Sequence, residues 1–268
     1  MKQLKQRYRY SIILLKQLVK TDFKLRYQGS ILGYAWSLLR PMALFLVLYL
    51  VFTRFINLGG EYEHWPVALL LGIVLWTYFA DVTTGSVGAI VGKGDLLRKI
   101  NFPKYVVILS VAMSALINLL INLFVVAIFM VINGVHITPL ILYLPLFILE
   151  LFVFSLALAF FLSAAFVRFR DISYIWEVIM QGLFYATPIL YIVQIIPVSI
   201  AKLMLLNPVA QIIQDSRYVA INHTQTETLT SLYDTRLIRV VPIAITLVVI
   251  IIAAVYFKKT SKNFAEYV

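Results

Sequence analysis

The chain has 268 residues, of which 62% are hydrophobic and only 13% are charged, whereas about 25% are charged in an average soluble domain. A soluble fold of this size cannot bury so much apolar surface, because a large part of any globule faces water. The composition therefore excludes a soluble enzyme and a disordered chain, and it favours an all-α polytopic membrane protein. The net charge of +11 fits basic cytoplasmic loops better than a nucleic-acid partner, and the lack of cysteine excludes disulfides and thiolate metal sites.

The first predicted element is an amphipathic helix over residues 11–28. Its apolar side chains recur at helical spacing, and its basic side chains fall mainly on the other faces. The apolar positions are Ile12, Leu15, Leu18, Val19, Phe23 and Tyr27. Such a helix either lies among the headgroups of an anionic inner leaflet or packs on a partner protein, and both readings can hold together.

Six further segments are long and apolar enough to cross a membrane as helices of about 20 residues. They cover residues 34–56, 66–91, 106–133, 140–167, 172–195 and 240–257. A proline lies at or near the start of five of these segments, where its missing N–H costs no helical hydrogen bond. Pro188 instead lies deep in the fifth segment, so we expect a kink or a break there.

Residues 198–222 are too polar to cross the membrane and too apolar for an open loop. We expect two short re-entrant or interfacial helices that meet at Asn207 and Pro208, because irregular backbone at membrane depth must be covered by protein or water. The polar residues that follow, up to Arg236, should face the exterior.

The distribution of Lys and Arg predicts the orientation. Eighteen of the 23 basic residues fall on one side of the expected spans, and five fall on the other. Because cytoplasmic loops carry the excess of positive charge, we expect both termini, the 92–104 loop and the 168–171 turn to be cytoplasmic.

The sequence contains no recognisable catalytic or metal-binding constellation. His64, His136 and His223 are isolated, each in an expected external loop. The segment 88–94 differs from a phosphate-binding loop, because three residues separate its first two glycines and Gly94 stands where Ser or Thr would bind Mg²⁺. We therefore expect no catalytic or metal site in this chain, and any ATP would be hydrolysed by another protein.

Three acidic residues fall inside the expected spans, where ionisable groups are candidates for function. Glu177 is close enough to the interface to pair with Arg168 or Arg170. Asp81 and Glu150 lie deeper, and they either line a polar pathway or form hydrogen bonds between helices.

Aromatic side chains gather in the second and fifth expected spans. They are Trp76, Tyr78, Phe79, Phe184, Tyr185 and Tyr191. Sugar rings stack on aromatic rings, and tyrosine hydroxyls can bind sugar hydroxyls, so these residues predict a substrate pathway along which a glycan could slide. For each residue taken singly, packing between helices is the alternative.

The cytoplasmic 92–101 loop predicts a short amphipathic helix. Asp95 can cap it, Leu96, Leu97 and Ile100 form its apolar side, and Arg98 and Lys99 lie opposite. An exposed helix with an apolar side is suited to a groove on a partner protein. A solvated loop is the alternative, but it leaves the two leucines unexplained.

Taken together, these segments resemble the permease subunit of polysaccharide-exporting ABC transporters of the ABC-2 family, as one transmembrane domain over residues 1–268. The similar segments are 22–33 with Trp36, Arg40 and Pro41; 72–79; 95–103; Arg170 and Asp171 with 187–191; and 206–208 with Arg217. Arg40 departs from the family, whose members often have an uncharged polar residue before the proline, so we assign it no role.

The resemblance implies a homodimer of this chain joined to two ATPase subunits, which bind ATP and Mg²⁺ while this chain holds no cofactor. The 92–101 helix would enter a groove on the ATPase. The amphipathic 11–28 helix and the 168–171 turn would support it. The coupling residues would be Asp95, Leu96, Leu97, Arg98, Lys99, Asp22, Lys24, Arg26, Arg170 and Asp171. Asn207, Pro208 and Arg217 would belong to an external gate.

The same resemblance implies a multi-pass protein of the bacterial plasma membrane that exports an undecaprenyl-linked glycan such as an O-antigen, a capsule, a teichoic acid or a rhamnan. Its partners would be the ATPase, a second copy, lipids and the glycan, without nucleic acid. Two other classes stay open. A proton-coupled carrier would use Asp81 and Glu150, and a membrane enzyme that modifies glycans would need a convergent His or carboxylate pair.

Overall fold

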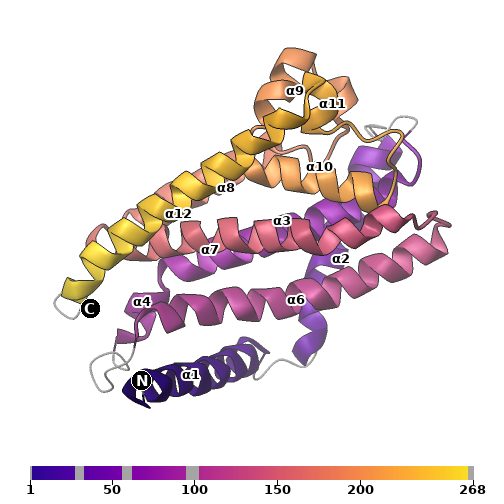
Figure 1. Cartoon of the computed structure of the whole chain (residues 1–268). Helices are drawn as coiled ribbons and strands as arrows, with labels where there is room; N and C mark the ends of the chain where they lie inside the picture. The colour runs from indigo at the N-terminus through magenta and orange to yellow at the C-terminus, as the bar shows by residue number, and fades with distance from the viewer. Residues whose placement is uncertain (1, 28–32, 56–61, 95–102, 265–268) are drawn as a thin grey trace.

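The structure is a computed structural model that describes residues 2–27, 33–55, 62–94 and 103–264. Within these ranges every regular element is helical, as predicted for an all-α membrane protein. The elements form an elongated bundle in which long helices lie side by side and a group of short helices sits at one end (Figure 1).

Four elements of the described chain are long and apolar enough to cross a membrane. They are α3 (Trp65–Val87), α6 (Tyr105–Ile132), η3 (Pro139–Tyr143) with α7 (Leu144–Arg168), and the end of η5 (Arg236–Arg239) with α12 (Val240–Thr260). They match four of the six predicted spans in order. Pro66 lies in the first turn of α3, where no intrahelical N–H is required.

The first predicted span, residues 34–56, forms a shorter and less regular helix. It begins as η1 (Gly33–Ala35) and α2 (Trp36–Leu48) and continues as a π-helical segment, η2 (Tyr49–Phe55). Its apolar helical part covers residues 36–52, which is shorter than the four elements above.

The fifth predicted span, residues 172–195, is not one continuous helix. Helix α8 (Ile172–Ala186) ends before Thr187, whose backbone is extended. The residue before a proline avoids the helical region for steric reasons, so Pro188 ends the helix. The predicted kink or break at Pro188 is confirmed as a break, whereas the extent of this span to residue 195 and the count of six spans stay predictions.

Helix α3 is the centre of the bundle. It packs against α2, α6, α7, α8 and α10, and nearly all of its side chains from Trp65 to Val82 are buried. Helix α12 by contrast packs mainly on α7 and leaves most of its apolar surface exposed. A central helix surrounded by apolar-faced neighbours is what a membrane-embedded bundle requires, because lipid replaces water on the outer surface.

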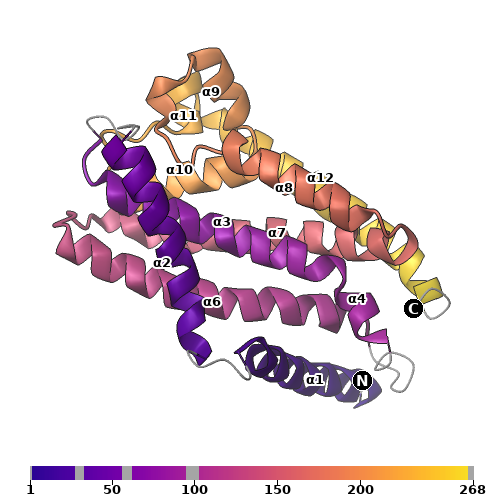
Figure 2. The ribbon, with the colours of Figure 1, turned by 180° about the vertical axis from the view of Figure 1, so that it is seen from behind.

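Helix α1 (Lys2–Tyr27) confirms the predicted helix over residues 11–28 and extends it towards the N-terminus. It lies against α6, next to the short helix α4 (Ala89–Gly92) that follows α3 (Figure 2). Leu18 faces inward, whereas Ile12 is 48% exposed. The apolar face is therefore only partly used within this chain, and the lipid and partner-protein readings both stay predictions.

The short helices gather at the other end of the bundle, where α12 begins (Figure 1). They are α9 (Val198–Met204), α10 (Pro208–Ala220) and α11 (Leu229–Tyr233). The prediction of two helices separated at Asn207 and Pro208 is confirmed, whereas their depth in a membrane stays a prediction. We call this part the gate end, and we call α1, α4 and the start of α6 the coupling end.

Candidate functional site

One buried arginine binds backbone carbonyls of α3 and of the segment that follows the break after α8. Arg217, on α10, is 1% exposed, and its Nε donates to the carbonyl of Ala68 at 3.0 Å. Its Nη1 and Nη2 donate to the carbonyls of Pro188 and Ile189 at 2.6 and 2.8 Å. The planar guanidinium can bind all three oxygens at once. This predicted gate residue therefore connects α10, α3 and the segment after α8.

The residues of α3 around Arg217 are fitted to its side chain. A Cβ at Gly72 would lie 2.7 Å from Nη2 of Arg217, so a larger residue would displace the guanidinium. The Trp65 ring lies under it, with its centroid 5.3 Å from the guanidinium carbon. Burial lowers the pKa of Arg217 to about 10, which still leaves the side chain protonated at neutral pH. Carbonyl dipoles and a ring face thus stabilise the charge.

The turn between α9 and α10 lines an apolar cavity. Asn207 caps α10 by accepting a hydrogen bond from the backbone N–H of Val209 at 3.0 Å, and Pro208 occupies the first turn. The cavity has a volume of about 340 Å³, and Trp76 and Phe79 line it together with these two gate residues. The predicted gate and part of the predicted substrate pathway therefore share one space.

Five of the six predicted pathway residues form a connected aromatic network. The Trp76 ring lies 5.5 Å from Phe79 and 5.7 Å from Phe184, measured between centroids. Phe184 packs edge-on against Tyr185, whose carbonyl accepts a hydrogen bond from the Tyr191 hydroxyl at 2.7 Å. The network extends from α3 across α8 to the segment after the break.

Tyr78, the sixth of these residues, lies on a different face of α3. It lines a separate cleft between α2, α3 and α6, together with Arg40, Asp81 and two asparagines of α6. No role was predicted for Arg40, and the two asparagines were not among the predicted site residues. The only local sign was that Asn118 and Asn122 lie one helical turn apart in an otherwise apolar segment.

A second polar network, which the sequence analysis did not assemble, lies at the gate end. Gln211 donates to the carboxylate of Asp215 at 2.7 Å, and Arg239 approaches the same carboxylate at 3.8 Å. Glu150 of α7 lies close to these three residues. Burial raises the pKa of the Asp215 carboxyl. Glu150, which the sequence left between two roles, thus takes part in contacts between helices.

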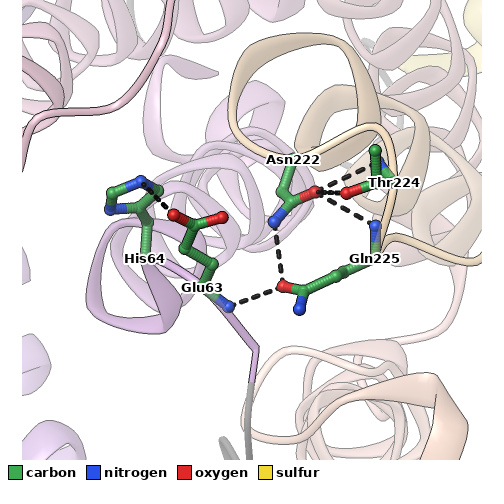
Figure 3. Close-up of polar contacts among 5 residues, drawn as sticks. All are labelled: Glu63, His64, Asn222, Thr224 and Gln225. Atoms are coloured by element: carbon green, nitrogen blue, oxygen red, sulfur yellow. Dashed lines mark hydrogen bonds and ion pairs between the residues drawn. The ribbon is translucent and has the colours of Figure 1, made fainter.

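The loops at the gate end are joined by side-chain amides, as Figure 3 shows. The Oδ1 atom of Asn222 accepts hydrogen bonds from the backbone N–H groups of Thr224 and Gln225, both at 3.0 Å. The Oε1 atom of Gln225 accepts one from the backbone N–H of Glu63 at 2.6 Å. His64 lies 3.6 Å from the Glu63 carboxylate. These contacts attach the segment before α3 to the loop after α10.

No group of three potential metal ligands occurs among the described residues. His64, His136 and His223 belong to no such group within the described ranges.

At the coupling end, Asp22 of α1 joins two other elements. The ammonium of Lys93, just after α4, lies 2.9 Å from both oxygens of the Asp22 carboxylate. The hydroxyl of Ser110, near the start of α6, donates to the same carboxylate at 3.1 Å. Asp22 therefore joins α1 to Lys93, just after α4, and to the start of α6.

The other predicted coupling residues belong to α1, to the turn after α7 or to the segment after α4. Lys24 and Asp171 are exposed, and the guanidinium of Arg170 lies over the Phe166 ring at 5.1 Å. Arg26 belongs to α1. Residues 95–99, and with them Asp95, Leu96, Leu97, Arg98 and Lys99, lie outside the described residues.

The two described ends of the chain both lie at the coupling end. The ammonium of Lys104, before α6, lies over the Phe264 ring at 5.1 Å and donates to the carbonyl of Ser261. Helix α1 begins at Lys2 at the same end of the bundle (Figure 1). The described ends of the chain, Lys2 and Phe264, therefore lie at the end of the bundle where α4 lies.

A bundle with four helices long and apolar enough to cross a membrane, among the described residues, indicates a membrane-embedded protein. The chain belongs to the ABC-2 type transporter family, whose model matches residues 13–220. Membership of this family makes it a multi-pass membrane protein and implies a separate ATP-binding partner subunit. The family predicted from the sequence is thereby confirmed.

Among curated proteins, the chain is similar to two O-antigen export system permease proteins named RfbA. It is 30% identical to the protein from Myxococcus xanthus over an aligned region of 218 residues. This region covers 81% of this chain and 83% of the relative. It is 28% identical to a protein from Klebsiella pneumoniae over an aligned region of 218 residues. This region covers 80% of this chain and 83% of the relative.

Proposed function

We propose that this chain is the membrane subunit of an ATP-driven exporter that moves a lipid-linked cell-surface polysaccharide across the bacterial plasma membrane. The observation that carries this proposal is the similarity, over most of both chains, to permeases named for O-antigen export. The aromatic network beside the gate turn supports it, because stacked rings give a sugar chain many weak and equivalent contacts.

The energy for export comes from the ATPase partner, which holds ATP and Mg²⁺. The loop after α4 is the proposed contact with that partner, and α1 stands beside it through the bond between Asp22 and Lys93. A movement of the loop would be passed to α1 through this ion pair and to α6 through the hydrogen bond between Ser110 and Asp22. It would also be passed to α3 through α4, which packs on it. Closure of two ATPase subunits would thus act on three helices of the bundle.

The functional unit is proposed to be a homodimer with six spans in each chain. Helix α2 with η2, and α8 with the segment after its break, would complete the six. Both helices leave large apolar side chains exposed, among them Leu46 and Val178. Lys2 and Phe264 lie at the same end of the bundle, which supports an even number of crossings. The excess of Lys and Arg in the loops expected at this end supports a cytoplasmic location for it.

Deletion of the gene from its host tests the proposal. Cells without the chain should lose surface polysaccharide and accumulate lipid-linked polymer on the cytoplasmic side, and wild-type chain should restore export. The purified chain should show no ATPase activity until its partner is added. Unchanged surface glycan after deletion, or nucleotide hydrolysis by this chain alone, would contradict the proposal.

A further inference from the structure

The cleft between α2, α3 and α6 has mainly apolar walls and several polar side chains, near the middle of α3 and α6. It has a volume of about 430 Å³, within the range of about 300–1,000 Å³ that is usual for small-molecule sites. Its polar lining includes Ser37, Arg40, Thr77, Tyr78, Asp81, Asn118 and Asn122. Polar groups at this depth are costly and point to function.

Three buried polar atoms of this lining have no hydrogen-bond partner in the described structure. They are the Tyr78 hydroxyl and the Oδ1 atoms of Asn118 and Asn122. At Asn122 the hydrogen bonds fix which end of the side-chain amide is nitrogen and which is oxygen. Its Nδ2 donates to two backbone carbonyl oxygens, of Ser37 at 3.2 Å and of Asn118 at 2.8 Å. The remaining atom of that amide is therefore an oxygen that can only accept.

These atoms select the chemistry of a ligand. Phosphate and carboxylate groups offer mainly acceptors, so they would leave the two amide oxygens unpaired. Neutral sugar hydroxyls donate to the amide oxygens and to the Asp81 carboxylate, and they accept from the guanidinium of Arg40. The Trp36 ring, 48% exposed at the cleft, offers a face on which the C–H groups of a sugar can stack.

We infer that this cleft is a binding site for sugar units of the exported glycan. Asn118, Asn122 and Asp81 accept hydrogen bonds from sugar hydroxyls, Tyr78 contributes its hydroxyl, and Arg40 contributes donors. The inference rests on the proposed function and adds to it a contact site on a different face of α3 from the aromatic network. It also gives Arg40 a role.

The test uses the full chain in lipid nanodiscs and the fluorescence of Trp36. Glucose, galactose, mannose and rhamnose are titrated separately, and inorganic phosphate is titrated in parallel. The Trp36→Phe variant supplies the background from the other tryptophans. We expect a saturable change with at least one sugar and none with phosphate.

Two variants locate the binding in the cleft. Tyr78→Phe removes only an unpartnered hydroxyl, and Asn118→Leu replaces an unpartnered amide at similar volume. Each should weaken sugar binding by about 3- to 10-fold, the usual effect of one hydrogen bond. The matched control is Ser155→Ala on α7, which removes another buried hydroxyl without a partner, but outside the cleft. It should bind sugar as the wild type does.

Three outcomes would overturn the inference. A response to phosphate without one to sugar would make the cleft an anion site. The absence of any sugar response would show that it holds water only, as would wild-type affinity in both Tyr78→Phe and Asn118→Leu. The gene deletion is read out separately, so intact export without sugar binding refutes the cleft alone, whereas unchanged surface glycan refutes the proposed function.

Discussion

The gate end and the coupling end are held by different kinds of contact. At the gate end, Arg217 is fully buried and its guanidinium binds three carbonyls. At the coupling end, the ion pair between Asp22 and Lys93 leaves about a quarter of each side chain exposed. A buried cation with fixed partners cannot shift without leaving polar groups unpaired, whereas a partly solvated ion pair can exchange with water.

This difference fits the two tasks of an exporter. The fixed clamp at Arg217 keeps the segment after α8 in place against α3, so the aromatic network has a stable wall. The more exposed pair at Asp22 can break and re-form in water, so α1 is held to the residue after α4 less firmly than the segment after α8 is held to α3. We therefore expect changes at the gate end to act mainly on folding, and changes at the coupling end to act mainly on the use of ATP.

The largest loss of stability is expected from Gly72→Ala. The added Cβ would lie 2.7 Å from Nη2 of Arg217, and the guanidinium cannot move away without losing hydrogen bonds to carbonyls. We expect a loss of about 2–3 kcal/mol in the free energy of unfolding, measured by thermal or denaturant unfolding in detergent.

The matched control for this prediction is Gly182→Ala on α8. A Cβ there would meet nothing within 4 Å, and alanine favours a helix over glycine by about 1 kcal/mol. This variant should be as stable as the wild type or more so. Equal stability of Gly72→Ala and Gly182→Ala would show that Arg217 is not held as described.

The largest effect on energy coupling is expected when Leu96 and Leu97 are both replaced with Asp. Charged side chains cannot enter an apolar groove on the ATPase, so the partner's ATP hydrolysis should no longer drive export. Export in cells and ATPase activity of the purified complex measure this, and unfolding in detergent should remain as in the wild type. Normal glycan export by the double variant would contradict the coupling assignment.

Much of the fold could be predicted because membrane helices are set by local composition. Long apolar runs predicted α3, α6, α7 and α12, and Pro188 predicted the break in the fifth segment. The path of the chain after α8 could not be predicted from the sequence. It depends on which group binds the backbone carbonyls that no longer have helical partners beyond Pro188. Here that partner is Arg217, which lies far along the sequence.

The candidate site was predictable to a lesser degree. Aromatic residues and the turn at Asn207 were found by type and spacing, and the structure brings most of them together. The cleft was not found, because Arg40, Asp81 and the asparagines of α6 belong to three different helices. Only the packing of α2 across α3 and α6 makes them neighbours, and no local pattern encodes that packing.

A smaller effect is expected from Asp22→Asn. The variant removes the charge that attracts Lys93 but keeps an amide that can accept from Ser110. We expect a loss of about 0.5–1 kcal/mol in stability, reduced further at high salt, together with weaker stimulation of the ATPase by its permease.

A double-mutant cycle with Lys93→Gln isolates this ion pair. The two single variants and the double variant should be similar in ATPase stimulation, since either change breaks the same contact. Additive losses would instead show that Asp22 and Lys93 act on separate structures and would remove the proposed link between α1 and the loop.

The smallest effect is expected from Asp215→Asn, and it should depend on pH. Burial raises the pKa of the Asp215 carboxyl above its usual value of 3.8, so the folded state binds a proton more readily than the unfolded state does. This group therefore makes stability fall as pH rises from about 4 through the raised pKa. The nearby groups are Glu150, Gln211 and Arg239.

An amide at position 215 does not titrate, so the variant should lose that part of the pH dependence. Unfolding of both proteins in detergent, measured across this pH range, should show the variant gaining relative stability as pH rises. Arg239 limits the gain, because it lies 3.8 Å from the carboxylate and stabilises its charged form. Parallel pH profiles would mean that Asp215 ionises in the folded chain as it does in the unfolded one, with Arg239 and water compensating fully for burial at the gate end.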